Sequence, residues 1–184
     1  MKLYLIRHGE SETNLSGCWT GWLDSKLTES GRNDAAGAGS YLEGIAFDRV
    51  FSSDLSRART TAEIALPQYD AEATPVLREI SVGSLEGSPI ASVDKALLGG
   101  GFTYFGGESH EELRERVRRF LGMIENLECE TVAAFTHGGF LRAILDEVFG
   151  IVLPRKKIRC ANCAIAILSY KDGEWMLDSW INTK

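Results

Sequence analysis

Two short apolar segments, far apart in the chain, both end in a histidine followed by glycine. Leu3–Ile6 is followed by Arg7-His8-Gly9, and Val132–Phe135 by Thr136-His137-Gly138. Apolar runs of this length are typical of buried strands in a parallel sheet. Open α/β sheets bind ligands at the carboxyl ends of their strands. The two motifs therefore predict an α/β fold whose site lies at that edge, with the two histidines at equivalent strand ends.

The rest of the chain alternates strand and helix patterns. Thr28 is expected to cap a helix that reaches about Leu42, and Ser53 or Asp54 a helix from Arg57 to about Leu66. Residues 75–80 look extended, and the glycines up to residue 107 indicate irregular connections. The other expected elements are strands at 49–52 and 131–136, helices at 111–127 and 140–149, and final strands at 163–170 and 174–181 joined by Asp172-Gly173.

Length and charge limit the class of protein. With 184 residues, the chain is expected to form one domain over residues 1–184. The net charge of −6 disfavours a nucleic-acid surface or a polybasic membrane patch, although Arg155-Lys156-Lys157 follow Pro154 in an expected linker. No secretory signal and no apolar stretch of the roughly 20 residues that span a bilayer occur. We expect a cytoplasmic protein with no nucleic-acid or membrane partner, and a homodimer as an open alternative.

Two histidines and two arginines suit phosphoryl transfer. A phosphoryl group in flight spreads negative charge over its equatorial oxygens, so its site needs fixed cationic donors and an in-line nucleophile. His8 can attack as a neutral imidazole whose other ring nitrogen donates to a backbone carbonyl. The expected phosphate ligands are the guanidinium forks of Arg7 and Arg57, a protonated His137, Asn14, and the N–H groups of Gly138-Gly139 where a helix opens.

Four motifs follow one another along nearly the whole chain. They are Arg7-His8-Gly9-Glu10-Ser11-Glu12-Thr13-Asn14, Ser53-Asp54-Leu55-Ser56-Arg57-Ala58, Leu77-Arg78-Glu79-Ile80-Ser81-Val82-Gly83 and Thr136-His137-Gly138-Gly139. Together they resemble the histidine phosphatase superfamily, also called the phosphoglycerate mutase-like family. The resemblance implies a three-layer α/β sandwich with a mostly parallel central sheet and helices on both faces. It also implies phosphoryl transfer through a phosphohistidine on His8, with no cofactor and no metal.

The same resemblance assigns further roles. Glu79 would donate a proton to the leaving alcohol and then activate water, with Glu86 and Glu108 as close rivals. Thr20 and Gly21 would contact the substrate, a small phosphorylated metabolite, as in the mutase branch. Separately, Cys160-x-x-Cys163 has the spacing of half a zinc site, but without a second pair we expect core thiols.

The branch of the family is less constrained. The short connection between Glu79 and His137, and Gly107-Glu108-Ser109 before a helix, look like the phosphatase branch. Leu85 stands where many of those phosphatases have tryptophan, and Cys18-Trp19-Thr20-Gly21-Trp22 looks more like a mutase. We expect a metal-independent phosphomonoester hydrolase. A cofactor-dependent phosphoglycerate mutase is the first alternative, and a catalytically silent phospho-ligand binding module the second.

Overall fold

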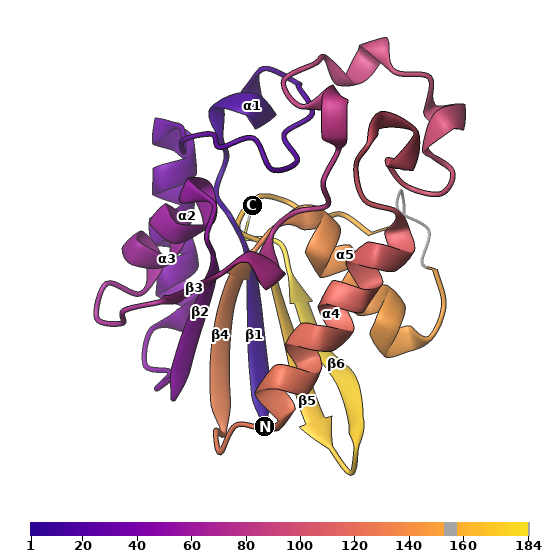
Figure 1. The fold of residues 1–184 in the computed structure, drawn as a ribbon. Helices are drawn as coiled ribbons and strands as arrows, with labels where there is room; N and C mark the ends of the chain where they lie inside the picture. Colours follow the sequence, from indigo (N-terminus) through magenta and orange to yellow (C-terminus); the bar gives the residue numbers. More distant parts are fainter. Residues whose placement is uncertain (153–157, 184) are drawn as a thin grey trace.

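The computed structural model describes residues 1–152 and 158–183. Its sheet has six strands: β1 (Lys2–Arg7), β2 (Arg49–Ser53), β3 (Glu72–Thr74), β4 (Thr131–Thr136), β5 (Ile165–Lys171) and β6 (Glu174–Ile181). Their order across the sheet is β3-β2-β4-β1-β5-β6 (Figure 1). The first four in that order are parallel, whereas β5 and β6 run antiparallel to their neighbours. The mostly parallel sheet predicted from the sequence is confirmed.

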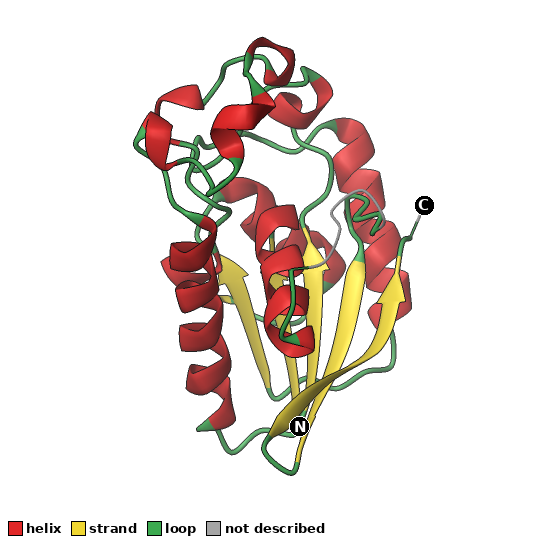
Figure 2. Cartoon of the chain, turned by 90° about the vertical axis from the view of Figure 1, so that its right-hand side faces the viewer, coloured by secondary structure: helices red, strands yellow, loops and turns green. Residues whose placement is uncertain are grey.

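Helices cover both faces of the sheet (Figures 1 and 2). The helices α2 (Glu29–Leu42) and α3 (Ser56–Ala65) pack on one face, and α4 (His110–Glu125) and α5 (Gly138–Phe149) on the other. Side chains alternate across a strand, so β1 supplies both cores. Leu3 and Leu5 lie under α4 and α5, whereas Ile6 lies under α2 and α3. The three-layer α/β sandwich is therefore confirmed.

One predicted helix cap is correct and another is wrong. Thr28 caps α2, with its Oγ1 accepting from the N–H of Gly31 at 2.9 Å. The N-cap of α3 is Leu55, which has no side-chain capping bond. Asp54 does not cap this helix because its carboxylate pairs with Arg78. Asp24 accepts from the Ser56 N–H at 2.9 Å instead, so a loop distant in sequence supplies the cap.

The last two strands form the predicted hairpin. Asp172 and Gly173 have φ values of 53° and 86°, as a two-residue turn with the twist of the strands requires. Before it, Cys160 and Cys163 enter different cores: Cys160 lies with the α4 and α5 side, and Cys163 packs beside Ala35 and Ala38. The pair thus does not converge as a zinc site would need. Arg155-Lys156-Lys157 lie outside the described residues.

Residues 75–107 form a crown of short turns above the carboxyl ends of the parallel strands (Figure 1). The prediction of extended chain is wrong at Pro75–Leu77, which form a 3₁₀ turn, because Thr74 caps it and proline favours its first position. A small α1 helix (Glu12–Leu15) belongs to the facing loop. Trp19 in that loop donates its backbone N–H to Ser88 O at 2.9 Å, so the two segments are joined. Four further 3₁₀ turns span Gly83–Leu85, Ile90–Ser92, Lys95–Leu98 and Thr103–Phe105.

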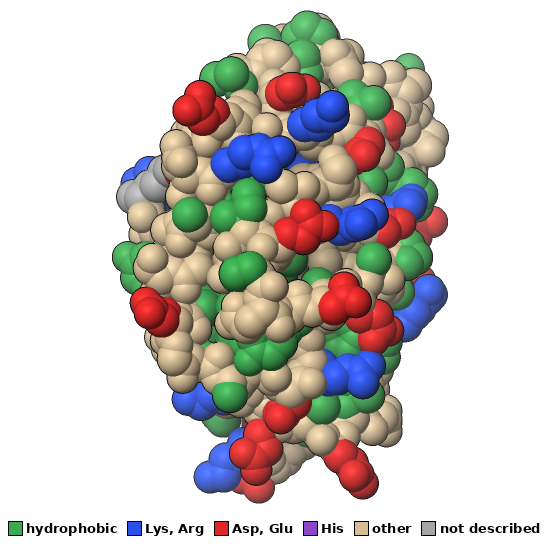
Figure 3. Space-filling model, turned by 90° about the vertical axis from the view of Figure 1, so that its left-hand side faces the viewer, with side chains coloured by type: hydrophobic (Ala, Val, Ile, Leu, Met, Phe, Trp, Pro, Cys, Tyr) green, Lys and Arg blue, Asp and Glu red, His purple; other side chains and the backbone are tan. Residues whose placement is uncertain are grey.

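Two general features bear on possible partners. No helix within residues 1–152 and 158–183 combines the length and apolarity needed to cross a membrane. On the face shown in Figure 3, acidic and basic side chains are interspersed and form no patch of one sign.

Candidate active site

The two histidines lie side by side because their strands are neighbours. β1 and β4 pair in register, with Arg7 opposite Thr136, and the His8 N–H donates to Thr136 O at 2.9 Å. The ring centroids of His8 and His137 are 5.1 Å apart. The sequence prediction that both stand at the same edge of the sheet is thus confirmed by the geometry.

His8 is held as a specific tautomer. Its Nδ1 lies 2.7 Å from Gly9 O, so Nδ1 carries the proton and donates it. Burial lowers the pKa of His8 well below its usual value of 6.5, and the charges of Arg57 and Arg7 lower it further. The imidazole is therefore neutral, with the lone pair of Nε2 left for attack. This is the backbone-carbonyl arrangement that the sequence predicts for a nucleophile.

The glycine that follows His8 is required by packing. A Cβ on Gly9 would collide with the backbone of Gly31, which lies near the start of α2. The Gly9 N–H donates to Thr61 Oγ1 at 3.0 Å, which ties the end of β1 to α3. The close approach of β1 to both helices therefore fixes the direction in which His8 points.

Arg57 is fully buried in the first turn of α3. We expected its guanidinium group to be a phosphate ligand, but in the structure that group donates to backbone carbonyls. Its two terminal nitrogens donate to Leu23 O at 3.0 Å and Gly21 O at 2.8 Å. Burial lowers the pKa of Arg57 to about 10, so the side chain stays cationic at neutral pH. Arg57 thus shapes the loop that carries Gly21 and also places a positive charge beside both histidines.

Arg7 and His137 complete the group of side-chain nitrogens at this edge. One terminal nitrogen of Arg7 donates to Cys160 O at 2.6 Å. Nε2 of His137 lies 2.9 Å from Ser53 Oγ. We expected a protonated His137, but burial, with the charges of Arg57 and the neighbouring His8, lowers its pKa well below 6.5. His137 is therefore neutral in the free protein, and a bound dianion would favour its protonated form.

Several buried nitrogens at the site have no hydrogen-bond partner in the part of the chain that the structure describes. Because a buried N–H without an acceptor costs free energy, such a group points to a site for an anion. A Cβ on Gly138 would lie 3.3 Å from Arg7 Nε and 3.4 Å from a terminal nitrogen of Arg142, so these two guanidinium groups flank the start of α5. The unpartnered atoms are Nε of Arg7, Arg57 and Arg142, and Nδ1 of His137.

Glu79 lies at the N-terminus of α5, beside these cations. Its two carboxylate oxygens accept from the N–H groups of Ile80 at 2.9 Å and Gly139 at 3.1 Å. A Cβ on Gly139 would collide with this carboxylate, which explains the second glycine after His137. The other two candidates for the proton donor, Glu86 and Glu108, bind other groups. Glu86 accepts from the Trp22 N–H at 2.8 Å, and Glu108 pairs with Arg116.

The remaining predicted residues line the same edge but mainly build it. Asn14 closes the capping box of α1, and its Oδ1 also accepts from Asn162 at 3.3 Å. Thr20 Oγ1 lies 2.8 Å from Thr13 Oγ1. Gly21 has a positive φ of 51° and offers its carbonyl to Arg57. Contact of Asn14, Thr20, Gly21 and Gly138 with a substrate stays a prediction.

Sequence reasoning missed the roles of three residues that hold the site together. Ser53 contacts His137, and Asn162 donates to His8 O at 3.2 Å. Arg116 pairs with Glu108 and also donates to the backbone around Glu79. Ser53 belongs to a motif already identified, and Arg116 stands eight residues after Glu108. Asn162 carries no sequence signal of this kind, because its contact spans nearly the whole chain.

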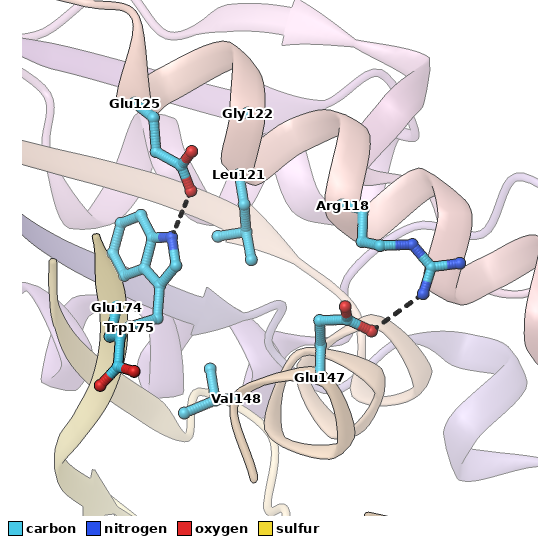
Figure 4. A pocket seen from close by; sticks show the side chains of 8 residues that line it. All are labelled: Arg118, Leu121, Gly122, Glu125, Glu147, Val148, Glu174 and Trp175. Atoms are coloured by element: carbon cyan, nitrogen blue, oxygen red, sulfur yellow. Dashed lines mark hydrogen bonds and ion pairs between the residues drawn. The ribbon is translucent and has the colours of Figure 1, made fainter. Parts of the chain in front are cut away.

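A cavity of about 300 Å³ lies beside Glu79: it is bordered by Ile80 and Gly139, whose N–H groups bind the Glu79 carboxylate. Another cavity, of about 440 Å³, lies between α4, α5 and the start of β6, and contains none of the site residues (Figure 4). Within it, Arg118 pairs with Glu147, and Trp175 donates to Glu125 at 2.6 Å. The cavity beside Glu79 is lined by Trp19, Ile80, Phe102, His110, Leu113, Gly139 and Arg142.

Comparison with known proteins gives consistent results over the whole chain. A probable phosphoglycerate mutase GpmB from Photorhabdus laumondii is 31% identical over 194 residues, covering 98% of this chain and 90% of that protein. A mutant phosphoserine phosphatase from Entamoeba histolytica, solved with phosphoserine, has a TM-score of 0.88 and 25% identity, covering 100% of this chain and 98% of that one. A mycobacterial glucosyl-3-phosphoglycerate phosphatase, solved with VO3, has a TM-score of 0.83 and 27% identity, covering 97% and 98%.

The family model of the histidine phosphatase superfamily (branch 1) matches residues 3–183, a range that contains every site residue described above. The strand-end histidines, the arginines beside them and these matches lead to one conclusion: the chain belongs to branch 1 of the histidine phosphatase superfamily.

Proposed function

We propose that the chain is a phosphomonoester hydrolase that acts on a small phosphorylated metabolite through a phosphohistidine on His8, without a metal ion. The observation that carries the proposal is the state of His8. It is a buried, neutral imidazole with Nδ1 committed to Gly9 O, and it faces His137, Arg7 and Arg57. A neutral nucleophile among fixed cations suits attack on a phosphate dianion.

The reaction divides into two balanced steps. In the first, Nε2 of His8 attacks phosphorus, the bond from phosphorus to the alcohol oxygen breaks, and Glu79 gives its proton to that oxygen. In the second, the Glu79 carboxylate takes a proton from water, the water oxygen attacks phosphorus, and the bond to His8 breaks. Inorganic phosphate leaves, and Glu79 is protonated again. The cations supply the charge stabilisation that both steps need.

Hydrolysis is supported by the solved relatives, which are named as phosphatases of phosphoserine and of glucosyl-3-phosphoglycerate. Both relatives act, by their names, on phosphate monoesters of small metabolites. The curated relatives are named as probable phosphoglycerate mutases, so a mutase is the second candidate. In a mutase the phosphohistidine passes its phosphoryl group back to an alcohol instead of to water.

The covalent step can be tested directly. With 32P-labelled substrate and rapid acid-free quenching, wild-type protein should carry label that is lost in acid and kept in base, and His8→Ala should carry none. Turnover of p-nitrophenyl phosphate should persist in EDTA. Label that remains in His8→Ala would refute the covalent role of His8, and activity abolished by EDTA would refute a metal-independent reaction.

A second assay separates the two candidate activities. The protein is incubated with 3-phosphoglycerate, with and without 2,3-bisphosphoglycerate, and both 2-phosphoglycerate and inorganic phosphate are measured. A hydrolase should release phosphate from several phosphate monoesters and form no 2-phosphoglycerate. Rapid formation of 2-phosphoglycerate that depends on the bisphosphate would favour the mutase.

A further inference from the structure

The cavity beside Glu79 has the position expected for the alcohol part of the substrate. Ile80 and Gly139 line it, and their N–H groups are the two donors that hold the Glu79 carboxylate, at 2.9 and 3.1 Å. In the proposed reaction Glu79 protonates the leaving oxygen. The group attached to that oxygen must therefore extend past Glu79, toward the space that these two residues border.

The walls of the cavity are mainly apolar. Ile80, Phe102 and Leu113 are buried core residues that also line it. The Trp19 ring meets Phe102 edge to face, with ring centroids 5.1 Å apart. A volume of about 300 Å³ is at the lower end of the range for small-molecule sites. The occupant is thus a compact group with apolar surface.

Two donor atoms belong to side chains that line this apolar cavity. Arg142 Nε and Trp19 Nε1 are buried and have no hydrogen-bond partner within residues 1–152 and 158–183. The guanidinium of Arg142 makes only a long contact of 3.4 Å to Gly138 O among the bonds of the described residues. A cation and an N–H donor on the lining of an apolar cavity match an anionic acceptor, and a carboxylate fits the planar guanidinium best.

We propose that this cavity binds the alcohol part of the substrate, and that this part is a compact, mainly apolar group carrying a carboxylate that Arg142 and Trp19 recognise. The inference rests on the proposed function, because it takes Glu79 as the proton donor. It narrows the substrate class to phosphate monoesters of apolar hydroxy acids. Arg142 then determines specificity, while Arg7 and Arg57 serve the phosphoryl group.

Binding of non-hydrolysable phosphonates tests this without using turnover. The dissociation constants of benzylphosphonate and 4-carboxybenzylphosphonate are measured by calorimetry for wild type and variants. Wild type should bind the carboxylated compound about tenfold to a hundredfold more tightly, the value of a charged hydrogen bond. Arg142→Gln should lose that preference but keep its affinity for benzylphosphonate. Trp19→Phe should lose about threefold to tenfold of the preference, since only a neutral donor is removed.

Two controls guard against misfolding. Arg142→Lys retains the charge and should retain part of the preference, and Arg119→Gln, on the exposed surface of α4, should bind both compounds as wild type does. Equal affinity of wild type for the two phosphonates would overturn the proposal. So would an equal loss for both in Arg142→Gln, which would assign Arg142 to the phosphoryl group. Absence of any phosphatase turnover would refute the proposed function instead, and these affinities would still be measurable.

Discussion

Replacement of Arg116 should loosen the segment that carries Glu79. Arg116 makes a two-pronged ion pair with Glu108, at 2.7 and 2.8 Å. It also donates to three backbone carbonyls: Val76 O at 2.9 Å, Arg78 O at 2.8 Å and Glu79 O at 3.0 Å. Methionine has a similar apolar stem but none of these donors. Arg116→Met therefore tests how far one side chain positions the proposed acid.

The expected loss of stability follows from burial. The side chains of Arg116 and Glu108 are 12% and 16% exposed, so removal of the arginine leaves a mostly buried, unpaired carboxylate. Breaking a buried pair in this way costs about 3–5 kcal/mol, and partial exposure places this pair near the lower value. The double variant Arg116→Met, Glu108→Met should recover part of that loss, because no charge is left unpaired. It should not recover all of it, because the three carbonyls and the Ser81 N–H still lose their partner.

The free energy of unfolding is measured by urea denaturation, in parallel with kcat on an alkyl phosphate. Arg119→Met, an exposed position on the same helix, is the matched control and should change stability by no more than about 0.5 kcal/mol. We expect Arg116→Met to lower kcat more than it raises KM, because Glu79 acts on the leaving oxygen. If Arg116→Met were no less stable than the Arg119 control, or kept wild-type kcat, the positioning role would be wrong.

Three further predictions concern the acid, the histidines and the glycine beside the acid. Glu79→Gln should slow single-turnover transfer from an alkyl phosphate by about 10²–10⁴-fold but affect p-nitrophenyl phosphate much less, because nitrophenolate departs without a proton. Because the pKa values of His8 and His137 are lowered in the folded protein, the unfolded chain binds more protons than the folded one below pH 6.5. The free energy of unfolding, measured by urea denaturation, should therefore fall as pH decreases from 6.5, by up to about 1.4 kcal/mol per pH unit for each histidine. Gly139→Ala should reduce kcat by displacing the Glu79 carboxylate, whereas Gly37→Ala, in an open position on α2, should be active and about 0.5–1 kcal/mol more stable.

Each of these has an outcome that contradicts it. Equal losses of single-turnover rate on both substrates in Glu79→Gln would show that Glu79 shapes the site without donating a proton. Glu115→Gln, at an exposed position on α4, serves as the matched control. A stability that is flat between pH 6.5 and 5.5 would mean that the two histidines are not held neutral. Wild-type kcat in Gly139→Ala would show that the collision with Glu79 is relieved elsewhere.

Local patterns in the sequence determined most of the fold. Apolar runs fix β1 and β4, the Thr28 side chain starts α2, and Asp172-Gly173 turns the final hairpin. Each of these depends on a few consecutive residues, through side-chain alternation, capping or the φ angles of a tight turn. The placement of His8 and His137 at one edge of the sheet also follows from the sequence, since buried parallel strands have their carboxyl ends at one edge. That the two strands are neighbours is a matter of strand order.

Only the tertiary structure decided how the side chains at that edge are used. The Arg57 guanidinium binds loop carbonyls, and His137 contacts the hydroxyl of Ser53. Of the three candidate acids Glu79, Glu86 and Glu108, Glu79 is the one that binds the first turn of α5. The fold also brings Arg116 under the Glu79 segment and Arg142 to the adjoining cavity. These contacts join residues far apart in the chain. They depend on strand order and on the path of the crown, which no local pattern contains, because a side chain's partner is set by what the fold packs against it.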